Sequence, residues 1–74
     1  MSSFEARQEM REQLRSVTAS LIAEFAGEVP AGAVIRCVAR ARHDLLSSGI
    51  HTGVPAAAEA IARLRLRDLV APHL

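Results

Sequence analysis

Apolar residues recur along the first third of the chain at alternating steps of four and three, which places their side chains on one side of an α-helix. Ser2 or Ser3 can cap the start of this helix, and Gly27 can take the left-handed conformation that ends it. The pattern predicts a first helix over residues 4–26. Its apolar stripe consists of Met10, Leu14, Val17, Leu21 and Phe25.

A second stripe follows Pro30, whose fixed φ and missing N–H suit the first position of a helix. The segment Ser47-Ser48-Gly49 then supplies a stop, because its glycine can take the left-handed conformation. The pattern predicts a second helix over residues 30–48. Its stripe steps by four, three and four residues through Val34, Val38, Ala41 and Leu45.

Pro55 follows a valine, as Pro30 does, and predicts a third helix over residues 55–70. Glu59 and Arg63 form a favourably oriented i,i+4 pair within it. The residues expected to share one face of this helix are Ala57, Ala58, Ile61 and Leu64. Short loops between three helices favour antiparallel neighbours. The sequence therefore predicts an all-α fold, an antiparallel three-helix bundle that occupies residues 1–74 as one domain.

The second helix has an unusually wide apolar face. When its residues are projected at about 100° each, the apolar ones span about 180°, beyond the ~100° that a one-sided surface helix needs. A helix that contacts both of its neighbours accounts for much of this width, and a contact with another chain is the other explanation. A domain of 74 residues buries little core alone, so both explanations stay open. The arc contains Val34, Ile35, Cys37, Val38, Ala41, Leu45 and Leu46.

Composition restricts the class of protein. Half of the residues are hydrophobic and the net charge is +1, which argues against disorder. Cys37 is the sole cysteine, so no disulfide can form within the chain, and a lone thiol is typical of a reducing compartment. The N-terminus lacks the apolar core of a secretory signal, and no stretch approaches the ~20 apolar residues of a membrane span. We therefore expect a cytoplasmic protein.

Cys37 and Arg42 invite comparison with the phosphate-binding loop of cysteine phosphatases. Only four residues separate them, one fewer than in that loop, and no glycine opens a loop in this predicted helix. A reactive cysteine needs a helix N-terminus or an adjacent cation in an exposed setting. We therefore expect Cys37 to pack as a small hydrophobe in the core or an interface, with an enzyme working through this thiol as the least favoured reading.

The remaining polar residues give no catalytic or metal-binding set. His43, His51 and His73 lie far apart in the chain, and none pairs at i,i+4 with a histidine or cysteine. Capping of helix ends and loops explains the hydroxyl groups of Ser47, Ser48 and Thr52. The sequence predicts no enzyme activity, no metal and no cofactor.

Arginines form two paired rows that could meet phosphate groups. Arg36 and Arg40 share one face of the second helix, and Arg63 and Arg67 share one face of the third. The nearly neutral net charge and the lack of an aromatic platform favour solvated faces over a nucleic-acid site. A small nucleic-acid-binding domain is therefore the alternative function.

Arg65 projects onto the apolar arc of the third helix, beside Ile61 and Leu69. Its stem can lie along the apolar surface, its guanidinium can pair with Asp68 at i+3, or the helix can change course near its end. A carboxylate from a second chain is a fourth explanation.

The stretch LIAEFAGEVP over residues 21–30, followed by the second stripe and an Ala/Arg/Leu-rich third helix, resembles a bacterial family of short three-helix-bundle dimerisation domains. The resemblance covers residues 14–70. Members of that family stand alone or precede low-molecular-weight tyrosine-phosphatase-like and arsenate-reductase-like domains. The resemblance implies homodimerisation, and it implies a role beside such an enzyme.

The leading hypothesis is a non-enzymatic helical module that homodimerises through apolar helix faces, with helices one and two supplying most of the contact. A separately encoded protein is a further possible partner, and no membrane is expected. The candidate core or interface residues are Met10, Leu14, Val17, Leu21, Phe25, Val34, Val38, Ala41, Leu45, Ile61 and Leu64.

Overall fold

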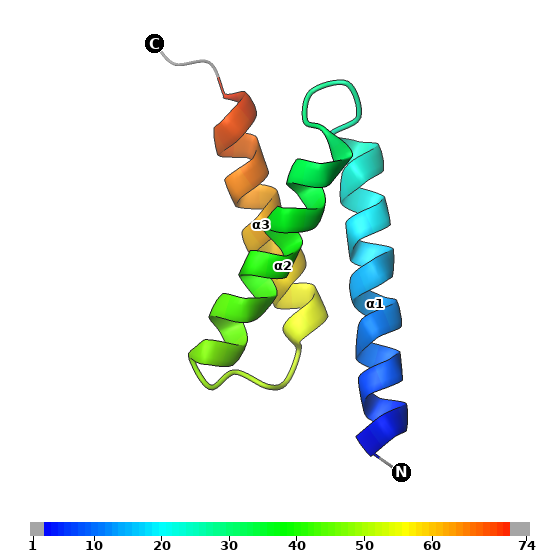
Figure 1. The fold of residues 1–74 in the computed structure, drawn as a ribbon. Helices are drawn as coiled ribbons and strands as arrows, with labels where there is room; N and C mark the ends of the chain where they lie inside the picture. Colours follow the sequence, from blue (N-terminus) through cyan, green and yellow to red (C-terminus); the bar gives the residue numbers. More distant parts are fainter. Residues whose placement is uncertain (1–2, 72–74) are drawn as a thin grey trace.

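The computed structural model describes residues 3–71, which form three α-helices that run up, down and up (Figure 1). The helices are α1 (Ser3–Glu24), α2 (Ala31–Ser47) and α3 (Val54–Val70), and no strand occurs within this range. Each helix contacts the other two. The prediction of an all-α, antiparallel three-helix bundle is confirmed.

The helix ends lie within two residues of the predicted ones. α1 ends at Glu24, before a turn in which Gly27 has the expected positive φ of 85°. Pro30 precedes α2 as its N-cap, with an extended ψ of 146°, instead of opening the helix. α3 begins at Val54, directly after Gly53, which has a φ of 65°. Ser2, which was proposed with Ser3 as a cap of the first helix, lies outside the described residues.

The core consists of two groups of buried apolar side chains, and Leu14 packs against both. The larger group contains Val17, Leu21, Phe25, Val29, Val34, Val38, Ala62 and Leu66. The smaller group contains Ala41, Leu45, Val54 and Ala58. All predicted core positions in the second helix are buried, whereas Met10, Leu14 and Ile61 are half-buried. Within residues 3–71 no polar or charged side chain is buried.

The buried row of α3 differs from the predicted one. Leu64 is 63% exposed, so of the two predicted locations for this residue, core or interface, the core is excluded. The buried residues instead follow one another at steps of four, which carries the row gradually around the helix. They are Val54, Ala58, Ala62 and Leu66.

Small side chains line the contact between α2 and α3. Ala41, Ala58 and Ala62 expose no surface, and α2 packs more extensively against α3 than against α1. Because the distance between packed helices depends on the side chains at the contact, alanines let these two backbones approach closely. The Cys37 thiol consequently reaches the carbonyl oxygen of Ala62, 3.7 Å away. α1 and α2 form the least extensive contact of the three helix pairs.

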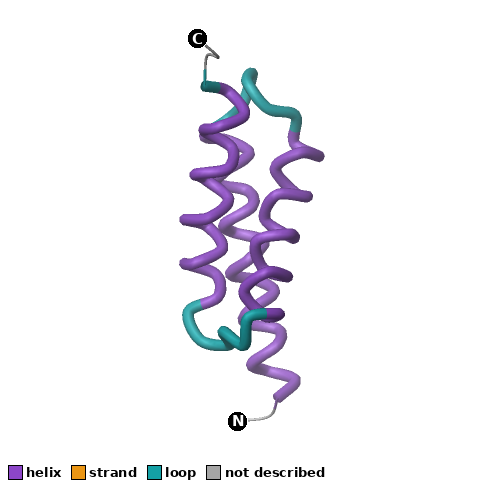
Figure 2. The backbone as a smooth tube through the Cα atoms, turned by 90° about the vertical axis from the view of Figure 1, so that its left-hand side faces the viewer, coloured by secondary structure: helices purple, strands orange, loops and turns teal. Residues whose placement is uncertain are grey.

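The bundle is elongated, with principal extents of 49 × 24 × 15 Å. Its radius of gyration is 13.2 Å, against about 11 Å expected for a compact domain of this length. Figure 2 shows one cause, since the first turns of α1 extend beyond the loop that joins α2 to α3. Every residue from Ser3 to Glu9 is exposed.

Candidate interaction surfaces

A groove follows the open seam between α1 and α2, and we call it the α1/α2 groove. It consists of two adjoining hollows of about 370 Å³ and 260 Å³, which share Arg11, Leu14 and Arg42 in their linings. Met10 and Arg7 complete the larger hollow. The smaller hollow is also lined by Arg15, Thr18, Ile35, Val38 and Ala39.

The floor of the α1/α2 groove is apolar. Leu14 is half-buried, Val38 is buried and Ile35 is 51% exposed. Thr18 adds a hydroxyl group, but this group already donates a 2.8 Å hydrogen bond to the carbonyl oxygen of Leu14. The floor therefore presents hydrocarbon to whatever lies in the groove.

Four arginines form the rim of the α1/α2 groove. Arg7, Arg11 and Arg15 follow one another at steps of four on α1, and Arg42 approaches from α2. Among the residues that the structure describes, none of the four forms an ion pair. Sequence reasoning missed this row, although the spacing of four on α1 was a usable signal. The contribution of Arg42 depends on the packing of α2 against α1.

A second apolar surface lies on the solvent side of α3, opposite its buried row, and we call it the α3 outer face. Leu64 and Ala60 are exposed there, and Ile61 is half-buried at the edge. The charged residues of this part of α3 pair at its flanks: Arg63 meets Glu24 of α1 and Glu59 of its own helix, and Arg65 meets Asp44 of α2. The α3 outer face comprises Ala56, Ala57, Ala60, Ile61 and Leu64.

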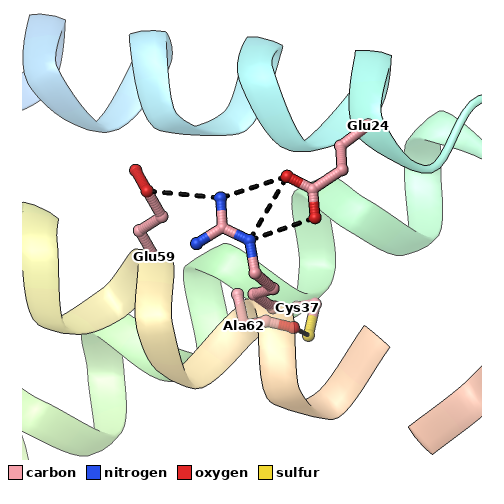
Figure 3. A network of polar contacts seen from close by, with 5 residues as sticks. Glu24, Cys37, Glu59 and Ala62 are labelled. Carbon is pink, nitrogen blue, oxygen red and sulfur yellow. Dashed lines mark hydrogen bonds and ion pairs between the residues drawn. The ribbon is translucent and has the colours of Figure 1, made fainter. Parts of the chain in front are cut away.

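Arg63 is the centre of a polar network between α1 and α3. Its Nε and Nη2 atoms donate to the Glu24 carboxylate at 3.0 and 3.1 Å, and Nη2 also donates to Glu59 at 3.3 Å. The predicted Glu59–Arg63 pair is thus confirmed. Figure 3 shows Glu24 and Glu59 pointing toward the same guanidinium group. The hydrogen bonds from Arg63 hold the pKa of Glu24 below its ordinary value.

Arg65 has a partner that spacing along the helix did not suggest. Its Nη2 atom lies 3.0 Å from Oδ2 of Asp44 on α2, and both side chains are nearly half exposed. Within the described chain the partner is Asp44 and not Asp68. Arg65 therefore forms an ion pair between α2 and α3 at the exposed edge of their contact.

The four predicted phosphate contacts do not form one basic surface. Arg63 is occupied by two carboxylates, and Arg36 and Arg40 line an open surface depression that also contains Asp44. Arg67 is exposed near the end of α3. A continuous row of available cations exists instead around the α1/α2 groove, on residues outside the predicted set.

The other candidate residues lie apart from one another. Cys37 is half-buried against the larger core group and beside Ala62 (Figure 3), as expected for a small hydrophobe. His43 lies 3.5 Å from the hydroxyl oxygen of Ser47, whereas His51 is exposed in the α2–α3 loop. His73 lies outside the described residues. No group of three or more potential metal ligands occurs within residues 3–71.

Comparison with known proteins adds no assignment. No family model, curated protein or solved structure matches the chain. Within residues 3–71, no helix combines the length and the apolar character needed to cross a bilayer. Functional inference therefore depends on the two surfaces described above.

Proposed function

We propose that the chain is a cytoplasmic, non-enzymatic helical module that homodimerises through the α3 outer face. The observation that carries this proposal is the exposure of Leu64, 63% of whose surface is open to solvent. It lies opposite the buried row, next to Ala60 and Ile61, and no charged residue interrupts this side of α3 from Ala56 to Leu64. Contiguous exposed apolar surface of this kind is typical of contacts between proteins.

The total exposed surface supports a contact with another chain. The accessible area is 5281 Å², against about 4400 Å² for a compact monomer of this mass. The protruding first turns of α1 contribute part of this excess. An interface of standard size covers about 800 Å² on each partner. If one such interface were covered, the exposed area of this bundle would be close to that of a compact monomer of the same mass.

The α3 outer face suits two-fold self-contact better than the face of helices one and two that the sequence hypothesis favoured. In a two-fold interface the same patch meets itself, so charges on the patch meet like charges. Two-fold contact through the α1/α2 groove would bring two sets of four arginines together. This is unfavourable because like charges would repel one another and lose their hydration. On α3, by contrast, Leu64 of one copy can pack against the alanines of the other.

The resemblance to the bacterial dimerisation domains supports the same oligomeric state. It also implies an association with a phosphatase-like or arsenate-reductase-like enzyme, which we retain as a proposal. The nucleic-acid alternative is weakened because Arg63, one of its four phosphate contacts, is engaged by Glu24 and Glu59.

Sedimentation velocity over a concentration series tests the proposal. We expect the mass to rise from 7.9 kDa for one chain toward twice that value as the concentration passes through the micromolar range. A protein that remains folded and sediments as a single chain at the highest concentration would rule out homodimerisation.

A further inference from the structure

The four arginines around the α1/α2 groove contrast with those on α3. Arg63 and Arg65 have carboxylate partners within the chain, whereas no rim arginine has one among residues 3–71. Four guanidinium groups around one hollow favour a positive local potential. The charge of the α1/α2 groove therefore favours a negatively charged ligand.

The shape and floor of the groove restrict that ligand further. The apolar floor offers nothing to a bare phosphate or a carboxylate, but it suits aliphatic side chains. From Arg7 to Thr18 the groove follows α1 over twelve residues, a rise of about 16 Å at 1.5 Å per step. A segment of about three helical turns fits this length. No aromatic side chain lines the groove, so it lacks the platform on which single-stranded nucleic acids stack.

We propose that the α1/α2 groove binds an acidic amphipathic helix of a partner protein. Apolar residues at i, i+3 or i+4 and i+7 of that helix lie on Leu14, Ile35 and Val38. Its flanking Asp or Glu residues pair with Arg7, Arg11 and Arg15 on one side and with Arg42 on the other. This site is separate from the α3 outer face, so the module can hold a second copy of itself and a partner helix at the same time.

A pair of labelled peptides tests this assignment by fluorescence anisotropy. The first is a helical peptide of about 14 residues with leucines along one face and glutamates on both flanks, and its twin carries lysine in place of every glutamate. We expect the wild-type protein to bind the glutamate peptide, with affinity that falls as salt rises, and not to bind the twin. Absence of binding by the glutamate peptide, or equal binding by both, overturns the proposal.

Two variants with matched chemistry locate the site. Arg42→Glu should weaken binding by about tenfold, as expected for reversing a charge that contacts the ligand. Arg40→Glu, on the opposite side of the same helix, should change it by less than about twofold. Arg11→Glu gives a second probe of the rim from α1 if the Arg42 variant fails to fold. Equal loss with Arg40→Glu contradicts a site in the groove.

Three parallel measurements separate this occupant from others. The first two measure binding of a single-stranded oligonucleotide and of a phosphatidylglycerol-containing vesicle. If either binds more tightly than the peptide and loses binding with Arg42→Glu, that ligand and not an acidic helix occupies the groove. The mass of the protein in solution is the third measurement. If Arg42→Glu alone lowers it, a second copy occupies the groove and the proposal fails.

Discussion

Arg63 of α3 donates three hydrogen bonds to Glu24 at the end of α1, although the two residues lie 39 positions apart in the chain. The pair joins the two helices that run in the same direction, and it engages one of the four arginines considered for phosphate binding. The side chains are 28% and 39% exposed, so water and salt screen the interaction.

Glu24→Gln should lower the melting temperature slightly at low salt, because it removes the charge but keeps the shape of the side chain. The difference from the wild-type protein should disappear at about 1 M salt, where the Debye length is about 3 Å. Thermal denaturation followed by circular dichroism checks both expectations. A difference that survives high salt would show that packing, not charge, accounts for the effect.

The same pair makes stability depend on pH. Because the pKa of Glu24 is lower in the folded chain, its contribution is present above the ordinary value of 4.5 and is lost as the pH falls through the lowered pKa. Melting temperatures between pH 6 and pH 3 should therefore decline less in Glu24→Gln than in the wild-type protein. Parallel decline in both proteins would contradict the lowered pKa.

The register of α3 can be tested with two leucines. Leu66→Ala should cost about 2–5 kcal/mol of unfolding free energy, because Leu66 is fully buried and truncation leaves a cavity. Leu64→Ala should change it by about 0.5 kcal/mol or less when measured at a concentration too low for association. Urea denaturation gives both values. The reverse order would place Leu64 in the core, which is one of the two locations that the sequence interpretation left open.

The alanine contact between α2 and α3 has no room for a larger side chain. Ala62→Leu should destabilise the fold by about 1–3 kcal/mol through overpacking. Ala19→Leu, at an exposed position of α1, provides the control and should leave stability nearly unchanged. Little loss with Ala62→Leu would mean that α2 and α3 lie farther apart than described.

Replacement of two glycines by alanine should change the stability of the protein in opposite directions. Gly27 has a φ of 85°, so Gly27→Ala should cost about 1 kcal/mol or more. Gly32 lies inside α2, where an added Cβ would meet only the Arg36 side chain at 3.6 Å, and Gly32→Ala should stabilise the protein by up to about 1 kcal/mol. Equal effects would indicate that the turn at Gly27 is not left-handed.

The stripes of α1 and α2 were predictable because each has large apolar residues on one side and polar residues on the other. α3 was harder, since Ile61, Leu64 and Leu69 point in different directions and alanine fits either side of a helix. Its buried row is decided by contact with α2, where Ala58 and Ala62 allow close approach and larger residues would not. The Asp44–Arg65 pair and the position of Arg42 likewise arise from packing between helices, which spacing along one helix does not encode.

The most direct test of self-association compares the solution mass of the wild-type protein with those of Leu64→Glu and Leu69→Glu. Leu64 and Leu69 are 63% and 66% exposed, and they lie about 140° apart around α3. At a concentration where the wild-type protein is dimeric, Leu64→Glu should sediment as a folded single chain and Leu69→Glu should remain dimeric. A folded Leu64→Glu that keeps the wild-type mass would show that the α3 outer face does not join the two copies.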